Sequence, residues 1–518
     1  MTSARLFSFL LVVSETDPQL VASSLESILA QTDPALEVCV VDDASPAEEV
    51  RTRIAAYEAR DPRVRVRLRT SAAGPCVAAN DALAMAEGDW VALVRTGDVV
   101  APHALALVGA ALETSPDADV LYTDHDVFDR PFHHVDAHLK PVWSPEALLS
   151  SNYVQGLAVF RRSVVRRAGG FAPDMQGAGD YDLLLRVTEA TSRVVHVPGV
   201  VYHRRAPLPV DWEAGQRALE AALTRRGVDG WVEPVAEWTG GYQVRRRLTH
   251  EPLVSVVIPT AGAVRRVRGK EIRLVEQAVE SLVQRTDYGN VEVVVVLSER
   301  TDPRLVDVLQ LLCRSTPVVA VQDSGRFDYA RAVNRGVARS SGELLLLLND
   351  DVEAIRPDWL RLLVEAVQDP EVGAAGSRLL FEDGSVQHAG VAHHSGLPFH
   401  PHHRDGPGPG YYGEVALSRN YLAVTGACMM TPRAAYERVG GLSPLFPVNY
   451  NDIDYCLKLR QAGQRVVYVG QSVLHHYESS SRDSSVTTAE INEWHRWWGP
   501  DVEPDPFLDE RRLPSHAP

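Results

Sequence analysis

The stretch Gly342–Glu353, GELLLLLNDDVE, decides how this chain folds. Five consecutive leucines fall far short of the roughly 20 apolar residues that cross a bilayer. A run that is apolar on both faces and ends at Asn349 predicts a central strand of a covered parallel sheet. Asn349, Asp350 and Asp351 would then stand at the carboxyl edge of the sheet, where open α/β folds bind ligands. Their oxygens suit Mg²⁺ or Mn²⁺ shared with substrate phosphates; a plain turn after a buried strand is the simpler alternative.

The composition is that of an ordinary globular protein. The 518 residues are 45% hydrophobic and 23% charged, which leaves room for two or three domains. A formal net charge of −16 argues against a nucleic-acid partner. The five cysteines include no CxxC pair, which predicts buried thiols in a reducing compartment. We find neither a membrane-spanning run nor a signal-peptide cleavage site, and we therefore expect a cytoplasmic protein.

The chain contains an internal repeat. Strand and helix alternate from Phe7 onward, and the same succession restarts at Leu253, as in doubly wound α/β domains. The two halves align at one constant separation over a long stretch. The aligned pairs are Asn80 with Asn334, Gly88 with Gly342, and Arg95 with Asn349. So many matches in one order indicate a duplication, and repeats of this size make two whole domains.

The repeat predicts an α/β chain of two tandem domains with mostly parallel sheets. We place the N-terminal domain at residues 1–206 and the C-terminal domain at 252–485. Residues 207–251 would form a linker with one helix and one short strand. The last segment, 486–518, is rich first in Trp and then in Pro. We expect this tail to pack over one domain.

Five stretches of the second half resemble bacterial family 2 glycosyltransferases, whose domains have the Rossmann-like GT-A (nucleotide-diphospho-sugar transferase) fold. They are LLLLLNDDVEAIRPDW, LLFEDGSVQHAGV, NYLAVTGACMM, NDIDYCLKLRQAG and HHYESSSR. The resemblance covers Phe7–His203 and Leu253–Arg482. Taken together, these stretches resemble the tandem-domain enzymes that assemble surface polysaccharides of the O-antigen or rhamnan type. It implies a nucleotide-sugar donor and a glycan or lipid-linked glycan acceptor. It leaves open a peripheral contact with the cytoplasmic face of the inner membrane or with other polysaccharide-assembly proteins.

The resemblance also implies roles for single residues of the second domain. Asn349-Asp350-Asp351 occupies the place of the DxD metal motif, so Asp351 is expected to bind the metal. Asn349 or Asp350 is expected near the metal or the ribose of the donor, with Asn349 counted as a metal ligand and Asp350 as a donor-binding residue. His476 matches a His that completes the metal or diphosphate site in relatives. The other expected donor-binding residues are Pro259, Asn334 and Glu299. The expected acceptor or substrate residues are Asn420, Gly426 and His388.

Asp452 corresponds to the carboxylate that acts as general base in the family. Asn451 resembles an N-cap, which would place Asp452 in the first turn of a helix. There the helix dipole favours an ionised carboxylate by roughly 0.3–1 kcal/mol. The alternative is that Asp452 is only a charge at a helix start. Asp454 lies four residues before Lys458, so we expect it to form a salt bridge or contact the acceptor.

Two departures from the family pattern limit this transfer of roles. Leu297 stands where relatives have an Asp that contacts the nucleotide base. In the first domain the DxD place reads Arg95-Thr96-Gly97, with Asp98 one position beyond, and a cation there argues against a metal. We therefore expect the first domain to be a degenerate copy. The polar remnants of its site are Asp42, Asp43, Asp98, Asp180 and His203.

The sequence favours a metal-dependent, inverting glycosyltransferase of the hexosyltransferase type, active in the second domain. Two other classes stay open. A nucleotidyltransferase of related fold would carry a basic Gly-rich loop, which Thr260–Glu271 matches poorly. A non-catalytic scaffold that binds sugar nucleotides is the other, because of Leu297. The six histidines between His388 and His403 would form a mobile lid on the acceptor side rather than a zinc site.

Overall fold

A computed structural model describes residues 6–14, 17–130, 133–205, 211–477, 486–499 and 504–513. The chain divides into two compact units. The first holds residues 1–144 and 151–234, and the second holds 145–150 and 235–518. The end of the HHYESSSR stretch, from residue 478, lies outside the described residues.

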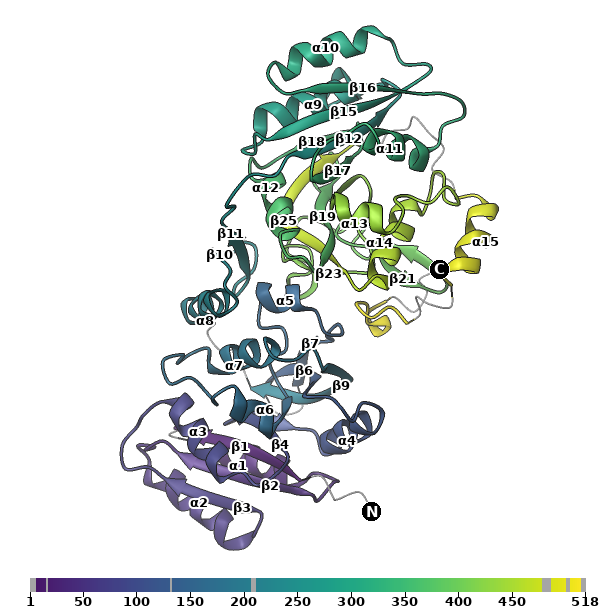
Figure 1. The fold of residues 1–518 in the computed structure, drawn as a ribbon. Coiled ribbons are helices and arrows are strands. Elements are labelled where there is room, and N and C mark those ends of the chain that lie inside the picture. Colours follow the sequence, from purple (N-terminus) through teal and green to yellow (C-terminus); the bar gives the residue numbers. More distant parts are fainter. Residues whose placement is uncertain are drawn as a thin grey trace. The chain divides into compact units, whose positions relative to one another are not determined.

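The first unit alternates strands and helices as the sequence predicts (Figure 1). Its elements are β1 (Phe7–Val13), α1 (Pro18–Leu29), β2 (Leu36–Asp42), α2 (Glu48–Arg60), β3 (Val64–Leu68), α3 (Pro75–Met85), β4 (Trp90–Arg95), β5 (Val99–Val100), α4 (Ala104–Thr114), β6 (Val120–Arg130), β7 (His133–His138), β8 (Ala158–Arg161), α6 (Arg162–Arg167), α7 (Gly179–Thr188), β9 (Val194–Arg205), α8 (Trp212–Arg225) and β10 (Gly230–Pro234).

The second unit repeats this succession and adds further elements. Its elements are α5 (Pro145–Ser150), β11 (Tyr242–Arg246), β12 (Val254–Thr260), β13 (Val264–Val267), β14 (Lys270–Arg273), α9 (Leu274–Arg285), β15 (Val291–Ser298), α10 (Arg304–Cys313), β16 (Val318–Asp323), α11 (Tyr329–Val337), β17 (Leu344–Leu348), β18 (Val352–Ala354), α12 (Trp359–Ala366), β19 (Val372–Leu380), β20 (Val386–His388), β21 (Ala392–His394), β22 (Leu397–Phe399), η1 (Tyr411–Gly413), β23 (Arg419–Asn420), β24 (Cys428–Pro432), α13 (Arg433–Arg438), α14 (Asn451–Gln461), β25 (Arg465–His476), α15 (Thr488–Trp497) and η2 (Glu510–Arg512).

The two large sheets have the same topology. The first runs β3-β2-β1-β4-β8-β6-β9-β5, and the second runs β16-β15-β12-β17-β24-β19-β25-β18. In each, the first four strands are parallel, the fifth is antiparallel to both neighbours, and the next pair is parallel again. Equivalent strands in one order confirm the duplication and the two tandem α/β domains.

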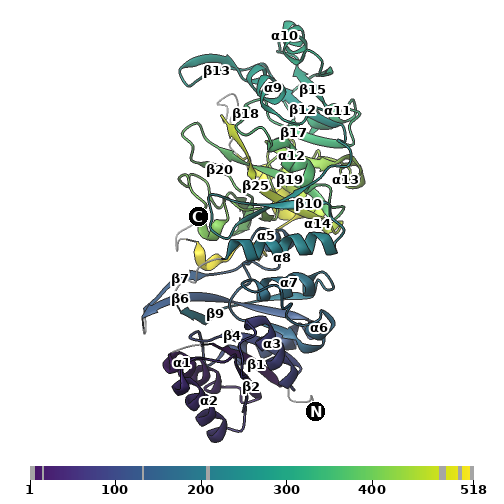
Figure 2. The same cartoon turned by 90° about the vertical axis from the view of Figure 1, so that its left-hand side faces the viewer.

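The leucine run forms the central strand β17, as predicted. Leu344, Leu346 and Leu348 pack into one core layer with α9, α10 and α12. Leu345 and Leu347 enter the opposite layer with α11, α13 and α14. Successive side chains of a strand point to opposite faces, so a strand covered on both faces needs apolar residues throughout. Figure 1 and Figure 2 show these helices around the second sheet.

A buried carboxylate holds the start of each central strand. Glu292 accepts hydrogen bonds from the hydroxyl of Ser255 (2.6 Å) and from the backbone N–H of Gly342 (3.2 Å). Burial raises the pKa of Glu292, but these bonds outweigh it and hold the pKa below its usual value. A Cβ on Gly342 would lie 2.5 Å from the Ser255 hydroxyl, so only glycine fits. The first unit repeats this group with Ser8, Glu37 and Gly88.

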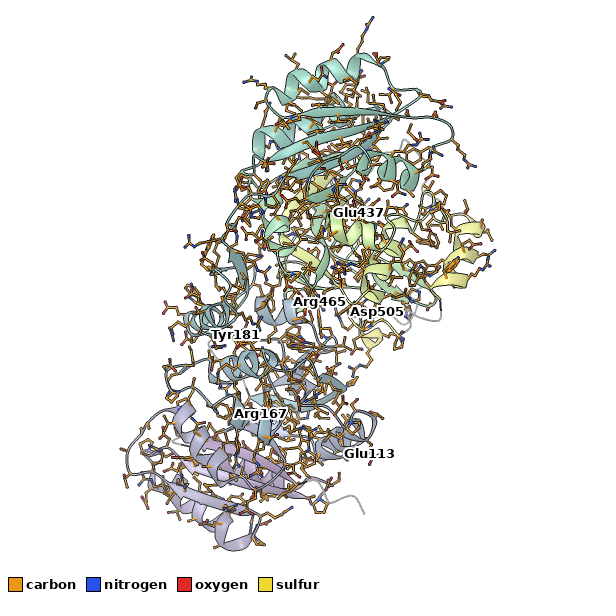
Figure 3. The ribbon with its side chains drawn as sticks, viewed as in Figure 1. Glu113, Arg167, Tyr181, Glu437, Arg465 and Asp505 are labelled. Atoms are coloured by element: carbon orange, nitrogen blue, oxygen red, sulfur yellow. The ribbon has the colours of Figure 1, made fainter. Side chains whose placement is uncertain are left out.

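The tail packs onto the second unit. Trp494 of α15 is fully buried in a cluster with Phe446 and Trp498. Asp505, labelled in Figure 3, accepts the backbone N–H of His393 at 2.7 Å. The tail therefore covers one face of the unit through its aromatic residues, as the composition predicted.

Two further predictions concern the cysteines and the membrane. All five cysteines are free and buried, as expected. Within the described ranges, we find no helix with both the length and the apolar character needed to span a bilayer. The stretch Thr260–Glu271, a poor match to the basic Gly-rich loop of a nucleotidyltransferase, contains most of the hairpin β13–β14. The first unit has no counterpart of that hairpin between β1 and α1 among its described residues.

Candidate active site at the edge of the second sheet

The carboxyl end of β17 brings a carboxylate and an imidazole together. Strand β18 pairs antiparallel with β25, which sets Val352 opposite His476. Asp351 precedes Val352, and its Oδ1 lies 3.0 Å from His476 Nε2. Both side chains are buried, at 5% and 9% exposure. The structure thus unites Asp351 and His476, two residues far apart in sequence that were both expected at the metal.

The hydrogen bonds of His476 show what this pair can hold. Its Nδ1 lies 2.8 Å from Oε1 of Gln387, which can only accept, so Nδ1 carries a proton. The amide nitrogen of Asn349 approaches Nε2 at 3.3 Å. The contact between Nε2 and the Asp351 carboxylate then needs either a second proton on the ring or a cation shared by both atoms. A carboxylate oxygen with an imidazole nitrogen is a donor set that divalent Mn²⁺ accepts.

Asp350 faces the neighbouring strand instead. Its Oδ2 accepts the hydroxyl of Thr260, at the end of β12, at 2.5 Å, and the same hydroxyl oxygen accepts the backbone N–H of Gly262 at 2.9 Å. Burial of the carboxyl group and the charge of Asp351 beside it raise the pKa of Asp350. Sequence reasoning missed Thr260, because a strand-end threonine carries no signal of its own.

Asp452 lies in the first turn of α14, as predicted, but the helix begins differently. The N-cap is Tyr450 in the left-handed region (φ 62°), not Asn451. The Asn451 amide donates to the carbonyl of Val448 at 2.8 Å, so it closes the preceding loop instead of capping the helix. Asp452 Oδ1 accepts the N–H of Ile453 at 2.9 Å. The half-buried carboxylate is thereby fixed at the positive end of the helix.

Residues 426–427 connect Asp452 to the end of β17. The backbone N–H of Gly426 donates to Asp452 Oδ2 at 2.8 Å. One residue on, the carbonyl of Ala427 accepts the N–H of Asn349 at 3.0 Å. A Cβ on Gly426 would lie 3.3 Å from the Asp452 Cβ and 3.4 Å from the hydroxyl of Tyr329. The proposed base and the metal motif therefore border one short backbone segment, which is tightly packed at Gly426.

Asp454 has a different role. It is buried, its Oδ2 lies 3.1 Å from Lys458 Nζ, and its Oδ1 accepts the indole N–H of Trp498 at 3.0 Å. The first unit has an equivalent ion pair between residues four apart on α7, Asp182 and Arg186. Asp454 thus forms the salt bridge that its spacing suggested, and it anchors the tail to α14.

Several expected donor and acceptor residues are committed to the fold. Asn334 donates to the carbonyl of Leu442 at 2.8 Å and accepts its N–H at 3.1 Å. Asn80 makes the same pair of bonds with Phe171 in the first unit. These bonds give Asn334 a role in packing, and its part in donor binding stays a prediction. Pro259 is buried in β12, and Asn420 donates a hydrogen bond to the Val466 carbonyl. Glu299 is exposed and accepts the N–H of Gly325.

The histidine-rich stretch differs from the mobile lid that we expected. It forms β20, β21 and β22, and His388 and His393 are each 1% exposed. His388 Nδ1 lies 2.9 Å from His400 Nδ1, and burial holds the pKa of His388 well below its usual value. Its Nε2 lies 3.4 Å from the N–H of Thr425, behind Gly426, so it supports that segment from inside.

The edge of the first sheet corrects the gapless alignment. Val99 pairs with His203 as Val352 pairs with His476. Asp98 precedes Val99 as Asp351 precedes Val352, so the strand pairing makes Asp98 the equivalent of Asp351. Because Arg95 is the equivalent of Asn349, the first unit has one extra residue between Arg95 and Asp98. The sequence alignment fixed Arg95 opposite Asn349 and had no signal for this insertion.

Asp98 is nevertheless unlike Asp351 in its contacts. Its Oδ2 accepts the hydroxyl of Tyr202 at 2.8 Å and its Oδ1 accepts the N–H of Arg205 at 2.9 Å. Burial raises its pKa. The side chain of Arg95 is exposed at the end of β4. Each oxygen of the Asp98 carboxylate thus already accepts a hydrogen bond from the protein, where a metal ion would need it as a ligand.

The other remnants of the first site are likewise engaged. Asp42 accepts the N–H of Ser45, and Asp43 accepts the N–H groups of Ala73 and Gly74. Asp180, exposed at the start of α7, accepts the N–H of its neighbour at 2.8 Å, as Asp452 does. These carboxylates shape loops around the sheet edge.

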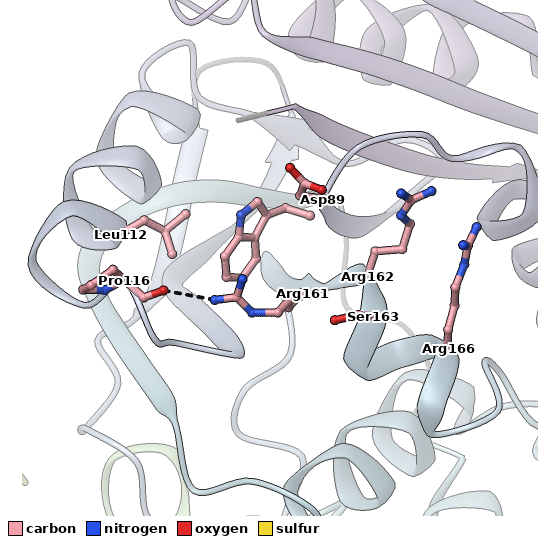
Figure 4. Close-up of a pocket in the computed structure, with 8 residues that line it drawn as sticks. Asp89, Leu112, Pro116, Arg161, Arg162, Ser163 and Arg166 are labelled. Carbon is pink, nitrogen blue, oxygen red and sulfur yellow. Dashed lines mark hydrogen bonds between the residues drawn. The ribbon is translucent and has the colours of Figure 1, made fainter. Parts of the chain in front are cut away.

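A pocket of about 340 Å³ lies at the opposite end of β4 (Figure 4). Trp90 lies at the start of the strand, and the guanidinium group of Arg161 lies over its ring, 4.6 Å from the ring centroid. Arg161 also donates to the carboxylate of Asp119 and to the carbonyl of Pro116. The pocket is thus at the amino end of the sheet, away from the edge that carries the site residues.

Comparison with known proteins decides the family. The model of glycosyl transferase family 2 matches residues 11–169 and 255–440, once in each unit. The chain belongs to glycosyl transferase family 2. Both matches include the central strands β4 and β17, so the duplication concerns this domain itself.

Two relatives match nearly the whole chain. A protein of Sinorhizobium fredii described as the uncharacterized protein y4gI is 36% identical over 93% of this chain and 54% of its own length. The O-antigen biosynthesis protein RfbC of Myxococcus xanthus is 34% identical over 96% of this chain and 40% of its own length. The chain therefore spans about half of these relatives.

Solved structures also match, at low similarity. Crystal structures of S. aureus TarS 1-349, alone and with UDP-GlcNAc, have TM-scores of 0.36 and 0.35, and they cover 42% of this chain and 65% or 66% of their own. They are 18% and 17% identical to this chain. The mannosyltransferase PcManGT of Pyrobaculum calidifontis, solved with GDP-Man and Mn²⁺, has a TM-score of 0.33 and 19% identity, over 45% of this chain and 59% of its own.

Proposed function

We propose that the second unit transfers a sugar from a nucleotide-sugar donor to a hydroxyl of a growing cell-surface glycan, with a divalent metal and with inversion at the anomeric carbon. The observation that supports this most is the contact of Asp351 with His476 at 3.0 Å, at a strand end that residues 426–427 link to Asp452. The family accounts for the class of reaction, and the contrast between the two units accounts for the choice of the second.

Asp351 and His476, with Asn349 beside them, are the residues that would hold Mg²⁺ or Mn²⁺. When bound, such an ion neutralises charge on the departing diphosphate. Asp350 keeps the end of β12 in place through Thr260, and Gln387 keeps the lone pair of His476 Nε2 directed at the carboxylate. A ligand oriented by such an outer hydrogen bond binds metal more strongly.

Asp452 is the proposed general base. Its carboxylate would take the proton of the acceptor hydroxyl as the hydroxyl oxygen forms a bond to the anomeric carbon and the bond to the diphosphate oxygen breaks. The bond from Gly426 and the helix N-terminus keep the carboxylate oriented and ionised. One displacement from the face opposite the leaving group inverts the configuration. A positioned base of this kind contributes typically 10²–10⁴-fold.

The acceptor and the cellular place are part of the same proposal. The Myxococcus relative is named for O-antigen biosynthesis, which supports a surface polysaccharide as the product. A lipid-linked glycan acceptor would bring the chain to the cytoplasmic face of the membrane. The nucleotide and the hexose are to be found by assay, because Leu297 replaces the base-contacting Asp of relatives.

The test is a panel of UDP-, GDP-, CDP- and dTDP-sugars with Mn²⁺, scored for released nucleotide. Release of nucleoside diphosphate by the wild type, and not by Asp452→Asn, supports transfer. Release of pyrophosphate from a nucleoside triphosphate and a sugar phosphate would make the protein a nucleotidyltransferase. Metal-dependent binding of a donor without release of either, with every glycan acceptor offered, would make it a scaffold.

A further inference from the structure

We infer that the first unit carries a transition-metal site of its own, built from Asp126, His134 and His203. The three residues come from the adjacent strands β6, β7 and β9. Their ligand atoms all lie within 4.8 Å of one another. None of them was expected to bind a metal in the first unit, and the site does not depend on the proposed sugar transfer.

The geometry of the three side chains is close to that of a loaded site. His203 Nδ1 lies 2.7 Å from Asp126 Oδ1, and His134 Nδ1 lies 3.1 Å from Asp126 Oδ2. Zinc binds nitrogen and oxygen at about 2.0–2.2 Å in tetrahedral geometry, which separates neighbouring ligand atoms by roughly 3.4 Å. An ion would therefore be admitted if the His203 contact with Asp126 opened by about 0.7 Å and the two imidazole nitrogens, which lie within 4.8 Å of each other, adjusted by about an ångström or less.

Burial and exposure are distributed as an open site requires. Asp126 is buried at the base of the cluster (side chain 9% exposed), whereas the side chain of His134 is 43% exposed. The two imidazole rings meet edge to face with their centroids 4.6 Å apart. Three protein ligands on one side and solvent on the other leave a fourth position for water or a ligand.

The second unit shows how this site differs from its counterpart. There the return strand of the equivalent hairpin, β20, offers the neutral amide of Gln387 to His476. In the first unit the return strand β7 places the imidazole ring of His134 edge to face against that of His203, and β6 places the carboxylate of Asp126 2.7 Å from His203 Nδ1. One neutral partner is thus replaced by two metal-binding groups, while Asp98 is engaged elsewhere.

The donor set identifies the kind of ion. Two imidazole nitrogens among three protein ligands suit Zn²⁺ and its transition-metal neighbours, whereas Mg²⁺ favours sites in which most ligands are oxygen atoms. An ion held here would tie the hairpin β6–β7 to β9 at the edge of the sheet. We therefore expect Zn²⁺ to stiffen this corner of the first unit.

The experiment uses the full chain without a histidine tag, stripped by a chelator and then dialysed against Zn²⁺. Zinc content is measured by mass spectrometry in the wild type, in His134→Ala and in His103→Ala, an exposed histidine of the same unit as the control. We expect His134→Ala to lose one equivalent of zinc and His103→Ala to lose none. Because His134 is exposed, the variant should fold, which circular dichroism checks.

Two further readouts separate this site from that of the second unit. Co²⁺ in place of Zn²⁺ should show the strong visible absorption of a tetrahedral site, absent in Asp126→Asn and kept in Asp351→Ala. Sugar transfer should be unchanged in His134→Ala. Equal zinc content in the wild type and His134→Ala, or no zinc in the stripped and reloaded wild type, would overturn the inference.

Discussion

The two sheet edges start from the same framework and end with different chemistry. In the second unit Asp351 faces an imidazole across 3.0 Å, whereas in the first unit Asp98, at the same place in the strand pairing, accepts bonds from a tyrosine and a backbone N–H. The exposed Arg95 adds a positive charge to the first edge. Duplication has thus preserved the scaffold while the residues at the strand ends diverged.

The preserved part is the part that packing dictates. Both units keep a buried glutamate that holds the start of the central strand, and both keep an asparagine that bridges to a double-glycine turn. A Cβ on Gly441 would lie 2.7 Å from the Asn334 oxygen, and φ there is 67°. Loss of such a contact destabilises the whole unit, whereas loss of a ligand at the edge costs only activity.

The largest expected effect is that of Asp351→Ala. The variant should lose transfer activity to background, at least about a thousandfold, because a metal supplies several kcal/mol of charge stabilisation. Arg95→Ala is the control and should keep full activity. The rate of nucleoside diphosphate release at saturating Mn²⁺ measures both. Equal losses in the two variants would show that the edges do not differ in function.

Asp452→Asn should lower turnover by about 10²–10⁴-fold, the usual contribution of a general base. Asparagine can still accept the Gly426 N–H, so donor binding should stay within about threefold of wild type, a difference below roughly 1 kcal/mol. Asp180→Asn changes the equivalent residue of the first unit and should have no effect. A larger loss in Asp180→Asn would assign catalysis to the first unit. A larger loss in Asp454→Asn would place the base two residues further on.

Gln387→Leu tests the orientation of His476. Without the Gln387 oxygen, the proton of His476 is no longer held on Nδ1, so Nε2 is less well fixed as a metal ligand. The affinity for Mn²⁺ should therefore fall by about 10–100-fold. Gln310→Leu, on the exposed face of α10, is the matched control. Titration of Mn²⁺ in the presence of nucleoside diphosphate gives both affinities. An unchanged affinity in Gln387→Leu would remove the imidazole from the metal site.

The smallest expected effect concerns stability, where the two units should agree. Glu37→Gln and Glu292→Gln should each destabilise their unit by about 1.5–3 kcal/mol, because each loses hydrogen bonds to a charged group. Bonding in the fold lowers the pKa of both glutamates. The difference in unfolding free energy between the wild type and each variant should therefore be complete above about pH 5 and shrink as the pH falls below about 4. Melting curves at both pH values measure it, and an effect in one unit only would contradict a shared framework.

The sequence predicts the scaffold well because periodicity reports burial. Strands and helices alternate from Phe7 onward and again after Leu253 as predicted, and the linker helix expected within 207–251 is α8. The insertion after Arg95 escaped because a single extra residue in a turn leaves the flanking patterns intact. Only the pairing of β5 with β9 reveals it.

The site is predictable only where a motif names its residues. The family resemblance named Asp351, His476 and Asp452. Asp351 and His476 lie 3.0 Å apart, and residues 426–427 link Asp452 to the end of the same strand. Their supports, Thr260 and Gln387, escaped because a lone threonine or glutamine has no characteristic spacing. The repetition of Asn334 in both halves has a packing explanation, because each copy bonds to the backbone just beyond a double-glycine turn. Contacts across the sheet, which sequence does not record, separate these cases.

The central claim is that the second unit holds the donor. The most direct measurement is an anomalous difference map from crystals of the full chain soaked with Mn²⁺ and a nucleoside diphosphate, UDP and GDP in turn. We predict a manganese peak between Asp351 and His476, next to the diphosphate. A diphosphate with manganese at Arg95 and Asp98, and none at Asp351, would contradict the account.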